Sequence, residues 1–188
     1  MAHVDDLTTV AKVKSHLGIA DAVVDPLLQN IITAASRWML SQMKRNIRSQ
    51  TYTEVFNGDG TYGITLTHGP VKSITSVSVD GETISARATV TGTGYVLQND
   101  RLCLVGYSFP EGTANVTVVY VAGYDTVPED LDQACVELVS LIYRSRDRKG
   151  MLSRSDTTGS SISFAPEAVP FITDLTMDAY RRVLGVPQ

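Results

Sequence analysis

The chain has 188 residues and a net charge of −4, from 16 Lys and Arg against 20 Asp and Glu. Hydrophobic residues make up 43% and charged residues 19%, which excludes an intrinsically disordered chain. The low charged fraction is compatible with a surface that partners partly cover. The negative charge disfavours binding of nucleic acid over the whole surface, although local basic patches remain compatible with it. A chain of this length can bury about 70% of its unfolded surface without metals or disulfides.

Cysteine usage and apolar runs indicate reduced thiols and no membrane segment. Cys103 and Cys135 form no short motif, which favours cytosolic thiols over a secreted disulfide framework. Residues 1–6 are polar and acidic and do not have the pattern of a signal peptide. The longest apolar runs, at 116–122 and 138–143, are too short to span a bilayer.

Two helix patterns occupy the first 49 residues. Thr8 or Thr9 can cap the first helix, and Gly18 can adopt the left-handed conformation that ends it. Its apolar face consists of Leu7, Val10, Val13 and Leu17. Asp25 and Pro26 begin the second helix, since an acceptor side chain followed by proline suits a helix start. Its face consists of Leu28, Ile31, Ile32, Ala35, Trp38, Met39 and Met43.

Residues 50–126 change to short strands rich in Thr, Val, Tyr and Gly. We expect strands at 51–56, 64–66, 71–79, 95–97, 102–104 and 116–120. The turn at 57–60 should return the first strand as a hairpin, and Asp80-Gly81 is a strong signal for a second, tight hairpin. The pattern predicts a predominantly antiparallel β module of six to eight strands, as a small sandwich or barrel.

The last third returns to helical periodicity. Residues 127–130 are a helix start, followed by a face of Leu131, Ala134, Cys135, Leu138, Leu141 and Ile142. A Ser-rich loop at 151–161 and a lone strand at 162–164 precede a last helix, whose face consists of Phe171, Ile172, Leu175, Ala179 and Val183. We therefore expect an α+β fold. A bundle of about four helices, from 1–49 and 127–188, carries the β module at 50–126 as an insertion.

The sequence has no residue pattern typical of an enzyme active site or of a metal site. His3, His16 and His68 have no metal-ligand spacing to one another or to the cysteines. Residues 57–68 fail as a calcium loop, because Tyr62 replaces the required glycine and His68 the bidentate glutamate. No nucleophile elbow or phosphate-binding glycine loop is present. We assign no catalytic, cofactor-binding or metal-binding residues and expect no enzymatic activity and no cofactor.

Eight residues form the candidate partner interface. A basic cluster lies at and beyond the end of the third helix: Arg144, Arg146, Arg148, Lys149 and Arg154. It either complements the helix dipole in water or contacts an acidic partner or DNA phosphate. Ile162, Phe164 and Phe171 lie next to the loop at 151–161. We expect residues 153–188 to form a C-terminal arm that docks on a partner, where the lone strand could add to the sheet edge of another chain. The alternative is that the last helix packs back on the second and third helices of its own chain.

The order of several motifs along the chain resembles the head–tail connector proteins of tailed bacteriophages, also called adaptor or head-completion proteins. The motifs are VKSHLGI at 13–19, LLQNIITAAS at 27–36, GPVKSITSV at 69–77, YVAGY at 120–124, VPEDLDQA at 127–134 and YRSRDRK at 143–149. A Ser-rich loop and YRR at 180–182 complete the series. The resemblance covers nearly the whole chain, and order and spacing carry it more than any single motif.

The resemblance implies a structural virion protein without catalytic residues. Such proteins form a homo-oligomeric ring, commonly of twelve copies, beneath the portal, where they extend the DNA channel and present a platform to stopper or tail proteins. It implies a helical core with a β insertion, a place in the virion neck, and the host cytoplasm during assembly. DNA would pass without sequence-specific binding, and the net negative charge agrees with a channel that does not hold phosphates.

Two other functions stay open at the level of the sequence. One is a neck or tail-completion protein at a different level of the same tube. The other is a cytosolic module whose β domain binds a small ligand or peptide. Ring formation would separate the connector from the binding module, since a binding module need not close into a ring.

Overall fold

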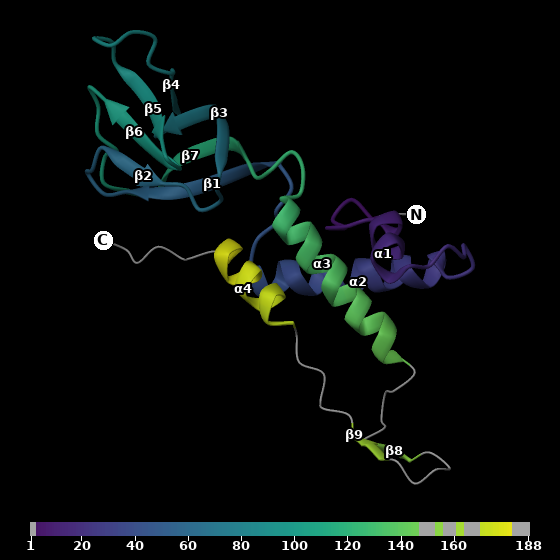
Figure 1. Ribbon diagram of the computed structural model, residues 1–188. Helices are drawn as coiled ribbons and strands as arrows, with labels where there is room; N and C mark the ends of the chain where they lie inside the picture. Colours follow the sequence, from purple (N-terminus) through teal and green to yellow (C-terminus); the bar gives the residue numbers. More distant parts are fainter. Residues whose placement is uncertain (1–2, 147–152, 156–160, 164–169, 182–188) are drawn as a thin grey trace. The chain divides into compact units, whose positions relative to one another are not determined.

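The computed structural model describes residues 3–146, 153–155, 161–163 and 170–181 (Figure 1). It has an α+β fold, as predicted. Four helices and nine strands lie in this described part of the chain. Residues up to Arg45 and Val127–Val183 form a helical unit, and Asn46–Thr126 forms a compact β unit. No helix of the described residues combines the length and apolarity needed to cross a membrane.

Helices α1 (Val10–Leu17) and α2 (Asp25–Met43) begin and end close to the predicted residues. The Thr9 side chain accepts a hydrogen bond from the Lys12 N–H and caps α1, and Gly18 ends it with φ at 69°. Asp25 does not act as a cap, contrary to our prediction. Its carboxylate instead accepts a hydrogen bond of 2.7 Å from Lys14 in α1, which ties the two helices together.

Helices α3 (Glu129–Ser145) and α4 (Phe171–Tyr180) complete the helical unit. α2 and α3 each pack against the other three helices of the unit. The core includes ten buried side chains that the sequence placed on the inner faces of the first three helices: Val13, Leu28, Ile32, Ala35, Met39, Met43, Leu131, Ala134, Cys135 and Leu138. Burial raises the pKa of the Cys135 thiol to about 12, so this cysteine is an inert core residue.

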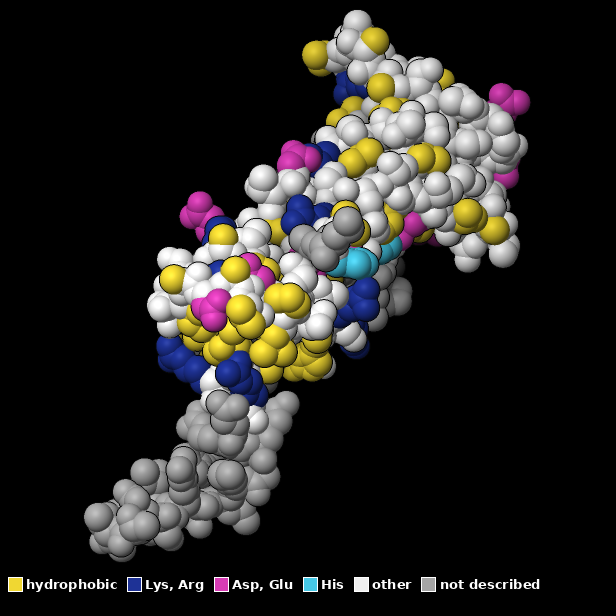
Figure 2. Space-filling model, turned by 90° about the vertical axis from the view of Figure 1, so that its right-hand side faces the viewer, with side chains coloured by type: hydrophobic (Ala, Val, Ile, Leu, Met, Phe, Trp, Pro, Cys, Tyr) yellow, Lys and Arg dark blue, Asp and Glu magenta, His cyan; other side chains and the backbone are white. Residues whose placement is uncertain are grey.

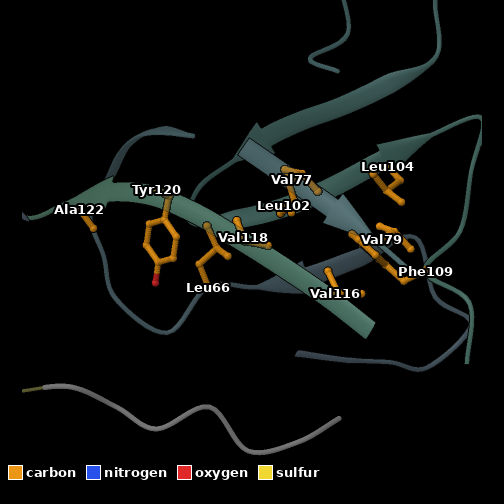
Figure 3. Packing of buried hydrophobic residues seen from close by; sticks show 10 residues of the cluster. All are labelled: Leu66, Val77, Val79, Leu102, Leu104, Phe109, Val116, Val118, Tyr120 and Ala122. Atoms are coloured by element: carbon orange, nitrogen blue, oxygen red, sulfur yellow. The ribbon is translucent and has the colours of Figure 1, made fainter. Parts of the chain in front are cut away.

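The β unit is a sandwich of two antiparallel sheets with the core between them (Figures 1 and 3). The larger sheet has the order β1 (Gln50–Gly58), β7 (Gly112–Ala122), β3 (Val71–Val79), β4 (Glu82–Ile84). The smaller sheet has the order β2 (Gly63–Thr65), β6 (Arg101–Val105), β5 (Gly94–Gln98). Figure 3 shows alternate residues of β3, β6 and β7 meeting in this core, with Leu66 and Phe109.

One of the two predicted hairpins forms and the other does not. Asp80 and Gly81 have φ values of 50° and 86° and join β3 to β4 in a tight hairpin. The turn around Asp59 and Gly60 instead leads from one sheet to the other, because β1 pairs with β7 and β2 pairs with β6. There the Asp59 carboxylate accepts hydrogen bonds from the backbone N–H and the hydroxyl of Thr61, which forms a turn that joins sheets.

The strand predicted at 162–164 does not stand alone. Ser161–Ser163 forms β9 and pairs antiparallel with β8, Ser153–Ser155, so that Arg154 lies opposite Ile162. The argument that this strand lacks a partner in its own chain is therefore wrong, because β8 lies directly upstream within the loop predicted at 151–161. Phe164 lies outside the described residues.

Candidate partner interface

The last helix presents an apolar face to solvent. Phe171 is 78% exposed, and Ile172 and Leu175 are each 60% exposed. The residues that α4 buries are instead Thr173 and Met177, and the Thr173 hydroxyl donates a hydrogen bond of 3.3 Å to the backbone carbonyl of Ala134 in α3. We expected the apolar stripe to pack inward, or to belong to an arm that reaches away. The helix does pack back on α2 and α3, but with the opposite side of α4 turned to the core.

This exposed stripe is called the α4 outer face, and it consists of Phe171, Ile172, Leu175 and Ala179. Its members fall within about 100° of the helix circumference at 3.6 residues per turn. The two carboxylates of Asp174 and Asp178 lie next to them, and both residues are exposed. At the end of α4 the Tyr180 hydroxyl donates to the Asp130 carboxylate at 2.9 Å, which fixes the helix against the start of α3.

A second apolar stripe lies exposed on α2. It is called the α2 outer face, and it consists of the exposed residues Leu27, Ala34 and Trp38 together with the half-buried Ile31. These residues follow the spacing i, i+4, i+7, i+11, one position before the buried stripe that begins at Leu28. Leu27 is 43% exposed and Trp38 38% exposed. α2 is therefore apolar over a wider arc than its own core requires.

Sequence reasoning placed Trp38 and Ile31 in the core and did not single out Leu27. The signal was nevertheless present, because apolar residues come in adjacent pairs along α2. The pairs are 27/28, 31/32, 34/35 and 38/39. A helix that packs on one neighbour needs one member of each pair, and the second members indicate a further contact. Figure 2 shows hydrophobic side chains gathered on one side of the helical unit, with Lys and Arg side chains around them.

The basic cluster is only partly described by the structure. Arg144 and Arg146 are exposed at the end of α3, and the Arg146 guanidinium lies 4.0 Å from the centre of the Tyr143 ring. Arg148 and Lys149 lie outside the described residues. Arg154 and Ile162 are paired in the β8–β9 ladder, where the structure describes the backbone only.

The structure separates Phe171 from the basic end of α3. The start of α4 contacts α3 at Ala134, through Thr173, and ten residues of helix separate Ala134 from Arg144. At 1.5 Å per residue this is roughly 15 Å along the axis. The predicted interface residues therefore do not form one continuous site among those described. They divide into a basic helix end and an apolar helix face.

A polar cluster in the β unit was not predicted from the sequence. The Glu54 carboxylate accepts hydrogen bonds from the Tyr120 hydroxyl at 2.7 Å and the Thr67 backbone N–H at 3.1 Å, and it lies 3.0 Å from Nδ1 of His68. The His68 ring stacks on Tyr52 with 3.9 Å between centroids. Residues of β1, of β7 and of the segment before β3 thus meet at one carboxylate.

The ionisation of this cluster follows from its contacts. Burial alone would raise the pKa of Glu54, but the hydrogen bonds from Tyr120 and Thr67 and the nearby His68 outweigh burial and lower it. Burial, together with the hydrogen bond to Glu54, raises the pKa of Tyr120 far above its usual range. Tyr120 therefore stays neutral and donates, and the cluster holds the loop after β2 onto the larger sheet.

Two further features of the described residues bear on ligand binding. Among the described residues, no three His, Cys, Asp or Glu side chains lie close enough to hold a metal ion. A groove of about 430 Å³ lies between α1 and α3, and it is lined mainly by polar residues such as Lys12, His16 and Glu129. Lys12 forms an ion pair with Asp132 across this groove, and the Asp132 side chain raises the pKa of Lys12. This groove lacks the apolar lining typical of small-molecule sites.

Comparisons with known proteins agree with the arrangement of a helical unit and a β unit. Three solved structures match with full coverage of this chain and 96% of the other chain. They are the neck of a native gene transfer agent (GTA) particle computed with C12 symmetry (20% identity, TM-score 0.58), the neck of an empty GTA particle computed with C6 symmetry (18%, 0.59) and the virion of a native GTA particle (20%, 0.60). These matches show a shared fold.

No curated protein sequence matches the chain. A family model described as "Head completion protein" matches residues 6–183, which is nearly the entire chain. The match spans both the helical unit and the inserted β strands, and it thereby includes every motif on which the resemblance to phage connector proteins was based. The chain belongs to the head completion protein family.

Proposed function

We propose that the protein is a head–tail connector of a phage-like particle. Several copies form a ring beneath the portal, extend the DNA channel and present the attachment platform for stopper or tail proteins. The family match supports a structural role in completing the head. The fold shared with chains from GTA necks supports a place in the neck of the virion, reached after synthesis in the host cytoplasm.

The single observation that supports ring formation is that one helical unit has two exposed apolar faces. A monomer is not stabilised by an arrangement that exposes Phe171 and Leu175 on α4 and Leu27 on α2 and buries Thr173. Such surfaces are stabilised when another chain covers them. The C12 symmetry applied to a similar neck structure supports about twelve copies.

For the portal contact, we propose the basic end of α3 and the segment that follows it. The set comprises Arg144, Arg146, Arg148, Lys149, Arg154, Ile162 and Phe164. Cations at this place can meet acidic portal residues, and the attraction should weaken with salt. Charge reversal at Arg146 and Arg148 together should therefore reduce attachment to portal-bearing heads more at low salt than at high salt. The thermal stability of the variant should stay within a few degrees of the parent chain.

Deletion of the gene tests the proposed function. Cells that make all other particle proteins should accumulate DNA-filled heads without tails, or heads that lose DNA, and a plasmid copy of the gene should restore complete particles. Complete, tailed and infectious particles in the absence of this protein would contradict the proposal. A tailed but unstable particle would favour the alternative of a tail-completion protein at another level of the tube.

A further inference from the structure

We propose that neighbouring copies in the ring contact one another through the α4 outer face of one copy and the α2 outer face of the next. The inference rests on the proposed ring and names the surfaces that close it. A ring requires a heterologous contact, in which two different surfaces of the same chain meet. The helical unit offers two different exposed apolar surfaces, one on α4 and one on α2.

Shape and size suit this pairing. Both faces are single stripes on helices, and two such stripes can pack as ridges into grooves. α2 has 19 residues and is about 28 Å long, whereas α4 has ten residues and is about 15 Å long. The shorter stripe of α4 can therefore lie within the longer stripe of α2 without leaving its own apolar residues uncovered.

Charge complementarity favours a second copy of this chain as the occupant. Asp174 and Asp178 border the α4 outer face, and Arg37 borders the α2 outer face next to Trp38. Asp178 pairs with Arg181 at 2.9 Å, whereas Asp174 forms no ion pair within the described part of the chain. The Arg37 guanidinium lies 3.2 Å from Nε2 of His3, so it has no carboxylate partner among the contacts described. Asp174 of one copy and Arg37 of the next thus provide the complementary charges.

The extent of the two faces also explains why a ring would depend on its site of assembly. Stable pairs bury about 800 Å² on each partner, contributed by 20–30 residues. Each outer face has four apolar residues, so one contact of this kind is small. Free copies would therefore associate weakly, and a portal that holds them side by side would bring the faces together.

Cross-linking of a double cysteine variant tests the contact. We would combine Ala34→Cys, at the centre of the α2 outer face, with Leu175→Cys, at the centre of the α4 outer face, and treat purified neck-containing particles with a short bismaleimide. Head-to-tail contacts should give a ladder of dimers, trimers and higher multiples. Each single variant should remain monomeric. The parent chain gives the background from Cys103 and Cys135, and Gln133→Cys with Leu175→Cys is the matched control.

A charge swap gives the second measurement. Asp174→Arg alone and Arg37→Asp alone should each lower the cross-linked fraction about five-fold. The combination of both substitutions should restore it to within about two-fold of the unswapped chain. Restoration identifies Asp174 and Arg37 as partners across the interface, since no effect on the fold of a single chain would be rescued in this way.

The remaining outcomes overturn the inference in distinguishable ways. Dimers without higher multiples would mean that two identical faces meet. Absence of cross-links in particles that contain the protein would mean that the faces have other occupants. If Phe171→Ser and Leu175→Ser leave the ring intact but prevent binding to heads, the portal covers the α4 outer face. If no particle contains the protein in a ring, the proposed function itself is wrong.

Discussion

At the scale of single residues, Glu54 is a hydrogen-bond acceptor shared by three segments of the β unit. It joins β1 to Tyr120 of β7 and to the segment at Thr67 and His68. Substitution Glu54→Gln should lower the free energy of unfolding at pH 7 by about 1–3 kcal/mol, because buried donors lose a charged acceptor. Urea unfolding of both chains measures the loss. Glu82→Gln, at an exposed position of β4, is the control and should have almost no effect.

The same carboxylate predicts a pH dependence. Because the folded state lowers the pKa of Glu54, its contribution is fully present above the pKa of the unfolded chain and is lost as pH falls through the folded value. The difference in stability between the parent chain and Glu54→Gln should therefore shrink below about pH 4. Parallel urea titrations from pH 7 to pH 3 measure this. A difference that stays constant over the range would mean that Glu54 is not held as a carboxylate.

Gly81 tests the one predicted hairpin that forms in the structure. Its φ of 86° lies in the left-handed region, and a Cβ at this position would meet no atom within 4 Å. Any loss from Gly81→Ala is therefore conformational, and we expect about 1–2 kcal/mol by chemical denaturation. Gly81→Asn should lose less, since asparagine tolerates this conformation better. Equal losses for alanine and asparagine would contradict this explanation.

At the scale of elements, α4 should be both part of the core and a binding surface. Met177 is 1% exposed, so Met177→Ala should lower the free energy of unfolding by about 2–5 kcal/mol. Leu175→Ala, only two residues away on the outer face, should change it by less than about 0.5 kcal/mol. Guanidinium unfolding monitored by circular dichroism compares the two. A larger loss at Leu175 than at Met177 would mean that α4 packs with its other side inward.

The packing of α4 also decides how its role can be tested. Removal of everything after Lys149 would delete Met177 and the hydrogen bond from Thr173, and the remaining chain should lose stability for that reason alone. Point substitutions on the outer face separate binding from folding, whereas truncation does not.

Most elements could be predicted from sequence because each has a local signature. The caps of α1, the stripe of α2 and the Asp80-Gly81 hairpin are such features. The pairing of β1 with β7 could not be predicted, since the two strands are separated by more than fifty residues and strand alternation does not specify the partner. The inward side of α4 was also predicted wrongly, because an apolar stripe looks the same whether its own core or another chain covers it.

The Glu54 cluster had no sequence signal for a related reason. Its members lie at positions 52, 54, 67, 68 and 120, and only the sandwich brings them together. The candidate interface was predicted in part. Phe171 and the arginines of α3 were identified as candidates, whereas Leu27 on α2 was missed because the paired apolar positions were read as one wide core stripe.

At the scale of the whole molecule, the proposed function requires several copies in a ring at the head–tail junction. Single-particle imaging of particles in which this chain carries a small C-terminal tag tests for this ring. We predict a closed ring of tag density directly beneath the portal, with about twelve copies around the DNA channel and absent from particles made without the gene. Tag density at single sites, on the capsid shell or along the tail, or a chain that is missing from complete particles, would contradict the claim.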